Sequence, residues 1–103
     1  MILKINDHEP VELRFTFSSF IAYEDKFGEP INLDNISFGR LISFYYFVVL
    51  CSKKGWQTSS WLSMEEFQEW LDNNPDKMFE ISTFIGDNFN LNDKMSKNDI
   101  KKN

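Results

Sequence analysis

The stretch that decides the fold lies in the middle of the chain. Residues 37–55 read SFGRLISFYYFVVLCSKKG, and between Leu41 and Cys51 the run is apolar apart from one serine. Its closing lysines complement the partial negative charge of a helix C-terminus, and the glycine permits a left-handed cap. We therefore expect a helix that starts near Ser37 and ends at Lys53-Lys54-Gly55, either as the central helix or as half of a subunit interface. A buried β-strand is the alternative interpretation.

Upstream of this run the pattern changes to the two-residue alternation of β-strands. Ile2–Ile5 and Val11–Phe17 alternate in this way, and the turn-rich segment Asn6–Pro10 separates them, which predicts a β-hairpin. The apolar side chains of the second strand share one face, so this face must pack against the rest of the chain. They are Val11, Leu13, Phe15 and Phe17.

Helical spacing begins where the hairpin is expected to end. A helix is predicted from Ser19 to Phe27, with Ser18 or Ser19 as its N-cap and Gly28 as its C-terminal stop. The apolar positions that indicate this helix are Phe17, Phe20, Ile21 and Phe27. A loop rich in Gly, Pro, Asn and Asp then leads to the central run, because these residues favour turns.

Two further helix starts follow the central run. Residues Ser63-Met64-Glu65-Glu66 match a capping box, in which the serine side chain and the glutamate three positions later satisfy each other's free backbone amides. Asn74-Pro75 combines a capping side chain with a proline, whose missing N–H costs nothing in the first turn of a helix. The apolar faces are expected at Phe67, Trp70 and Leu71 for the third helix and at Met78, Ile81, Ile85 and Phe89 for the fourth.

The predicted fold is mainly α. It consists of an N-terminal β-hairpin followed by a compact bundle of about four helices, an α+β arrangement with a small β content. A chain of 103 residues with 42% hydrophobic composition is sufficient for one core, so we expect a single helical domain with its hairpin over residues 1–91. Residues 92–103 have few apolar side chains to offset the entropy of ordering, which predicts a flexible polar tail.

Charge and cysteine content narrow the classes of partner and compartment. A net charge of −5 disfavours nucleic acid or an anionic membrane surface as the partner, since both attract basic patches. The longest apolar run is far below the roughly 20 residues of a membrane-spanning helix, and the N-terminus lacks the apolar stretch of a signal peptide. Cys51 is the sole cysteine; we expect it to be a buried small hydrophobe, which fits a reducing cytoplasm.

No residue pattern predicts catalysis, a cofactor or a metal centre. His8 is the only histidine and lies in the expected hairpin turn beside two acids, where a plain turn residue is favoured over a weak surface metal site. Nucleophilic catalysis would have to rest on this one group. The cluster Glu65, Glu66 and Glu69 suits a solvated helix start better than acid–base chemistry. Residues 87–93 are rich in Asp and Asn but lack the spacing of a calcium loop. We therefore expect a protein that is not an enzyme.

Particular strings resemble a known family. Residues 13–31 read LRFTFSSFIAYEDKFGEPI, residues 36–42 read ISFGRLI, and residues 63–67 read SMEEF. This order of strand, helix with a Gly-x-Pro turn, hydrophobic helix and Ser-x-Glu-Glu helix start resembles the tail assembly chaperones of siphophages and related prophages. The similarity covers about Val11 to Phe89 and rests on hydrophobicity and turns rather than on an invariant motif.

The resemblance implies a binding activity. Such a protein binds the long tape measure protein in the host bacterial cytoplasm while subunits of the tail tube protein, a further expected partner, assemble around it; self-association is also expected. Trp56, Trp61 and Trp70 suit either core anchoring, which is favoured, or an exposed patch. The partner-binding residues that we predict are the exposed parts of Phe44, Tyr45, Tyr46, Phe47, Trp56 and Trp61.

The alternative is a small cytoplasmic regulatory or nucleic-acid-binding helical protein. The third and fourth predicted helices would form a helix-turn-helix, with the fourth as the recognition helix. The first turns of this helix contain one cation, Lys77. A single cation is too few to contact the phosphates and bases of DNA.

Overall fold

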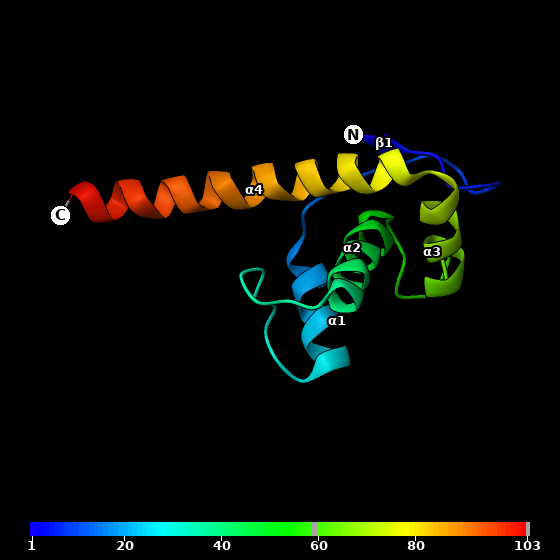
Figure 1. Cartoon of the computed structure of the whole chain (residues 1–103), viewed down its shortest axis with the longest axis horizontal. Coiled ribbons are helices and arrows are strands. Elements are labelled where there is room, and N and C mark those ends of the chain that lie inside the picture. The colour runs from blue at the N-terminus through cyan, green and yellow to red at the C-terminus, as the bar shows by residue number, and fades with distance from the viewer. Residues whose placement is uncertain (59, 103) are drawn as a thin grey trace.

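The computed structural model describes the backbone of residues 1–58 and 60–102 and the side chains of residues 1–58 and 60–88. Within these residues the chain is mainly helical with a small antiparallel hairpin, as predicted (Figure 1). The elements are β1 (Ile2–Leu3), β2 (Val11–Glu12), α1 (Phe17–Phe27), α2 (Phe38–Ser52), α3 (Met64–Asn73) and α4 (Pro75–Lys102).

Helix α2 is the centre of the fold. Ten of its fifteen residues are buried, and α1 and α3 both contact it, while α4 packs against α3 (Figure 1). The prediction of a central helix is therefore confirmed, and the strand alternative is wrong. The side chain of Ser37 caps its start by accepting a hydrogen bond of 3.3 Å from the amide of Arg40.

The end of α2 lies earlier than the Lys-Lys-Gly sequence suggests. The helix ends at Ser52 because Lys53 has an extended backbone. The hydroxyl of Ser52 donates to the carbonyl of Val48 at 2.7 Å and accepts from the amide of Arg14 at 2.8 Å, so it joins the segment after β2 to the last turn. Gly55 adopts its left-handed backbone in the turn that follows.

The hairpin is shorter than predicted. Only Ile2 with Glu12 and Leu3 with Val11 pair as strands, whereas the alternation suggested a second strand through Phe17. The strand stops because the backbone of Arg14 turns to the Ser52 hydroxyl of α2. The predicted apolar face still holds at its start, since Val11 and Leu13 are buried.

Helix α1 begins earlier than predicted, and its predicted apolar face is confirmed only in part. Its N-cap is Thr16, not Ser18 or Ser19, and the buried hydroxyl of Ser19 donates to the Thr16 carbonyl at 2.6 Å. Phe20 and Phe27 pack against the core beside the buried Ser19 and Tyr23, as predicted, whereas Phe17 and Ile21 are exposed. The C-terminal stop is confirmed, because Gly28 is left-handed and its amide donates to Glu24 at 2.7 Å.

Helices α3 and α4 start where the sequence indicates. The hydroxyl of Ser63 accepts from the amide of Glu66 at 3.1 Å, which is half of the capping box. Asn74 ends α3 and Pro75 opens α4. The predicted core residues Phe67, Trp70, Leu71, Ile81 and Ile85 are buried, and Met78 is half-buried.

The C-terminal part of α4 extends away from the other elements (Figure 1). The predicted position of Phe89 on the apolar face lies outside the described side chains. The backbone of residues 92–102 is helical, and their side chains are also outside the described part, so the flexible polar tail stays a prediction. Every helix in the described part of the chain is too short or too polar to span a lipid bilayer.

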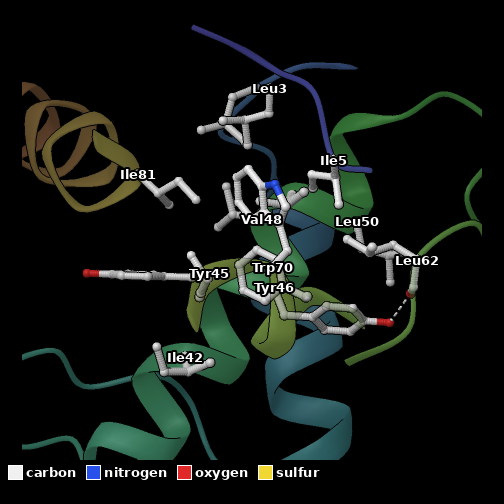
Figure 2. Packing of buried hydrophobic residues seen from close by; sticks show 14 of the residues in the cluster. Leu3, Ile5, Ile42, Tyr45, Tyr46, Val48, Leu50, Leu62, Trp70 and Ile81 are labelled. Atoms are coloured by element: carbon white, nitrogen blue, oxygen red, sulfur yellow. Dashed lines mark hydrogen bonds between the residues drawn. The ribbon is translucent and has the colours of Figure 1, made fainter. Parts of the chain in front are cut away.

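One apolar cluster joins all the elements. Leu3 and Ile5 of the hairpin region, Val48 and Leu50 of α2, and Ile81 of α4 meet in it (Figure 2). Cys51 is buried, as predicted, and burial raises the pKa of its thiol to about 11. A thiol with this pKa stays protonated near neutral pH and is a poor nucleophile.

Candidate interaction surface

The six aromatic residues predicted to contact a partner divide into two groups. Buried in the core are Phe44, Tyr45, Tyr46 and Trp61. Only Phe47 and Trp56 are half-buried and so have an accessible part. The first group therefore does not belong to an accessible surface in this chain. Of the three tryptophans, Trp61 and Trp70 are buried in the core and Trp56 is half-buried.

The polar groups of the buried aromatic residues have partners inside the chain. The hydroxyl of Tyr46 donates to the Leu62 carbonyl at 2.6 Å (Figure 2), and the indole N–H of Trp61 donates to the Leu50 carbonyl at 3.1 Å. A buried polar tip without a partner is costly, so these bonds make full burial possible. The two residues anchor the segment between α2 and α3 to α2.

A first groove runs along the outer side of α1, and we call it the α1 groove. Its residues are Ser18, Ile21, Ala22, Asp25, Lys26, Phe47 and Trp56. Phe17 is 86% exposed and lies one helical turn before Ile21, so it extends the apolar wall. The groove exists because the buried side of α1 is taken by Ser19 and Tyr23, which leaves a second set of apolar residues without a neighbour.

Trp56 reaches this groove through the turn that follows α2. Its amide donates to the Lys53 carbonyl at 3.3 Å, and the left-handed Gly55 precedes it. A residue with a Cβ is strained at the Gly55 backbone angle. The turn therefore fixes where the indole meets Phe47 and α1. The accessible pair, Phe47 and Trp56, is therefore held in place by helix α2 and by the turn that follows it.

A second groove lies between three helices, and we call it the α3 groove. Its side chains come from the start of α2, from α3 and from the first turn of α4. They include Phe38, Ile42, Gln68, Leu71, Asp72 and Met78. Phe38 is 70% exposed, and Phe79, beside Met78, is 80% exposed. Sequence reasoning missed this groove because its walls come from segments far apart in the chain.

A third, more polar hollow lies under the loop between α1 and α2. The Arg40 guanidinium stacks on the Phe27 ring at 4.8 Å and pairs with the Glu29 carboxylate. This hydrogen bond raises the pKa of Arg40. Because Glu29 neutralises the guanidinium, Arg40 does not offer a free charge to a ligand. The pair instead ties the loop between α1 and α2 to the start of α2.

The hairpin turn is fastened to the start of α3 by a polar cluster. The Nε2 atom of His8 lies 2.9 Å and 3.0 Å from the two carboxylate oxygens of Glu66, and the Asn6 amide donates to the same carboxylate at 2.9 Å. The hydrogen bonds from Asn6 and then His8 lower the pKa of Glu66. The imidazole also meets the Trp61 ring edge-on, with centroids 5.3 Å apart.

This cluster changes the interpretation of two predicted features. Glu66 makes no return bond of the capping box, because its carboxylate is used by Asn6 and His8. His8 is therefore a tertiary contact rather than a plain turn residue, while Glu65 and Glu69 are exposed on the solvated helix face as expected. Within the part of the chain that the structure describes, no three His, Cys, Asp or Glu residues form a group able to hold a metal ion.

Comparisons of the chain with protein-family models, with curated proteins and with solved structures find no match. Its function must therefore be inferred from the surfaces described above. These are two apolar grooves on an acidic chain, one beside α1 and one beside α3.

Proposed function

We propose that this chain is a phage or prophage tail assembly chaperone, which binds the tape measure protein during tail assembly and catalyses no reaction. The observation that supports the proposal most is the α1 groove, where the exposed Ile21 lines the same hollow as the half-buried Phe47 and Trp56, and the exposed Phe17 lies one helical turn before Ile21. Large apolar side chains that stay accessible together are typical of binding surfaces.

The charge of the chain suits this role. A client with long apolar helices aggregates unless its apolar stripe is covered, and a helix laid in a groove covers it. The chain has a net charge of −5, so a complex with its charged exterior turned outward stays dissolved. The proposed site of action is the host bacterial cytoplasm, where the client is made.

Two further partners belong to the proposal. Tail tube protein subunits meet the client during the same assembly step, and self-association brings several copies onto one client. Both would use apolar surface that a single copy leaves accessible outside the two grooves, and Phe79, which is 80% exposed, supplies part of it.

Co-expression with the tape measure protein encoded nearby tests the proposal. We expect a soluble complex that co-elutes from a sizing column, with light scattering giving its stoichiometry. The double variant Phe17→Gln/Ile21→Gln should reduce the recovered complex by about tenfold or more, because it removes the exposed anchors of the α1 groove. Both residues are exposed, so the fold should persist.

The matched control is Ile2→Thr. Ile2 is 68% exposed on β1, outside the residues of both grooves, and threonine keeps the branched side chain that strands favour. This variant should recover as much complex as the native chain. An insoluble client beside a free native chain would refute the proposal and favour a small regulatory protein instead.

A further inference from the structure

The floor of the α3 groove is apolar and its walls are helical. Ile42 and Leu71 are buried at its base, and Met78 is half-buried beside them. Phe38 stands at one end, largely exposed. The walls are helices rather than a sheet edge, so a strand lying here would find no continuous row of main-chain partners. A helix brings its own backbone hydrogen bonds and only has to offer side chains.

The groove lies on a different face of the molecule from the α1 groove. Ile42 lines the α3 groove and Phe47 lines the α1 groove, and both belong to α2. They are five positions apart in the sequence, which is about 140° around a helix of 3.6 residues per turn. One straight segment therefore does not fill both grooves at once.

The border of the α3 groove is acidic. Asp72 lines it, and none of its lining residues is basic. Helix α3 contains four acids and no lysine, arginine or histidine. Glu65 and Glu69 do not line the groove, but both lie within about 60° of Asp72 around α3, on its far side from Leu71, so they form the outer edge of this border. Among the described side chains, none of Glu65, Glu69 and Asp72 takes part in an ion pair.

The nearby cations do not neutralise this border. Lys77 pairs with Glu80 at 2.9 Å, and Arg40 is held by Glu29 over Phe27. Arg40 is two positions before Ile42, which places the two side chains about 160° apart around α2. The acidic border is thus left for a positively charged partner.

We propose that the α3 groove binds an amphipathic helix whose apolar stripe is flanked by lysine or arginine. The apolar residues fill the space above Leu71 and Met78, and the cations reach Asp72, Glu69 and Glu65. A second copy of this acidic chain fits less well, since its net charge repels the border. This proposal rests on the proposed function in one respect, namely that the client supplies the helix.

Two synthetic amphipathic helices test the proposal. Both have the same leucine stripe, and the stripe is flanked by lysines in one peptide and by glutamates in the other. Fluorescence anisotropy with the full chain should give binding of the lysine peptide about tenfold tighter than that of the glutamate peptide at low salt. The difference should shrink as salt screens the exposed charges.

Charge reversal locates the site. In Glu69→Lys/Asp72→Lys the preference should reverse toward the glutamate peptide. The control Glu9→Lys/Glu12→Lys changes the net charge equally at exposed positions of the hairpin region and should keep the preference for lysine. Equal effects of the two double variants, or no effect of the first, would overturn the proposal.

Two other results are decisive. If the chain alone dimerises by light scattering and Glu69→Lys/Asp72→Lys alters that dimer, a second copy occupies the groove and the proposal is wrong. If that variant loses the lysine peptide but still forms the tape measure complex, the groove binds a basic helix that the client does not supply, and the proposed function stands without it. The α1 groove variant Phe17→Gln/Ile21→Gln is expected to lose the tape measure complex but to bind the lysine peptide as tightly as the native chain does.

Discussion

Phe44 and Phe38 belong to the same helix, yet they lie in opposite environments. Phe44 is fully buried, with the rings of Phe20 and Tyr23 at 5.6 Å and 6.1 Å, whereas Phe38 is 70% exposed at the start of α2. The difference comes from what surrounds each turn of α2. Its middle is enclosed by α1, α3 and the hairpin (Figure 1), while its first turn borders the α3 groove.

The comparison teaches that identical side chains serve stability in one part of the molecule and binding in another. A buried phenylalanine contributes to folding, because its area is removed from water within the chain. An exposed one contributes little to folding and keeps its area for a partner. Four predictions sharpen this contrast.

The largest effect is expected for Phe44→Ala. Removing a fully buried ring leaves a cavity, and the free energy of unfolding should fall by about 3–5 kcal/mol. Phe38→Ala is the matched control on the same helix and should change it by no more than about 0.5 kcal/mol. Urea unfolding followed by circular dichroism measures both. Because domains are stable by only about 5–15 kcal/mol, Phe44→Leu offers a milder variant with the same ranking. Similar losses for Phe44→Ala and Phe38→Ala would break the comparison.

Tyr46→Phe should have the next largest effect. It removes the hydroxyl that donates to the Leu62 carbonyl and leaves a buried acceptor unsatisfied, which costs about 1–3 kcal/mol. Tyr45→Phe is the control. Its hydroxyl donates to the hydroxyl of Ser82, which is exposed. Water can replace this donor in the variant, so the free energy of unfolding should fall by less. The same unfolding measurement ranks them, and a larger loss for Tyr45→Phe would contradict the burial argument.

The starts of α2, α3 and α4 and the end of α1 were predictable because their signals are local, whereas the start of α1 and the end of α2 were not. The cap at Ser63, the first-turn proline Pro75 and the left-handed Gly28 act within one turn of the chain. The side chain of Asn74, in contrast, bonds to the Trp70 carbonyl of α3 instead of capping α4. The buried centre of α2 was also predictable, since a run that is apolar on nearly every side has to be enclosed. These features need no knowledge of what lies across the molecule.

The orientation of helices and the accessible surface were not predictable, because they depend on distant neighbours. The apolar spacing in α1 is shared by two faces, and only packing on α2 decides that Tyr23 turns inward and Ile21 outward. For the same reason the predicted contact surface included Phe44, which the core encloses. The contact of His8 with Glu66 joins residues 58 positions apart, beyond the reach of any local pattern.

A smaller effect is expected at this junction, and it depends on pH. The pKa of Glu66 is lowered in the folded chain by the hydrogen bonds from Asn6 and His8. A lowered carboxyl pKa stabilises the fold above the unfolded value of about 4.3, and the contribution is lost as pH falls through the folded pKa. Glu66→Gln should therefore destabilise the chain near neutral pH but not in acid below both pKa values.

Glu65→Gln is the control for this junction. Glu65 is exposed in the same first turn of α3, so it reports the general effect of the helix dipole without the hairpin contact. Urea unfolding at several pH values should give a steeper pH dependence for the native chain and for Glu65→Gln than for Glu66→Gln. Parallel curves for all three proteins would show that the junction contributes nothing through ionisation.

The smallest effect on stability is expected for Phe17→Ala, although this ring is as large as that of Phe44. Because 86% of Phe17 is exposed in the folded chain, folding removes little of its area from water, and the free energy of unfolding should stay within about 0.5 kcal/mol of the native value. The same variant should weaken binding of the tape measure protein, because a complex would bury that ring for the first time. A loss of stability comparable to that of Phe44→Ala would place Phe17 in the core and remove it from the α1 groove. Unchanged stability together with unchanged binding would leave the ring without a role, so the two measurements on one protein separate folding from recognition.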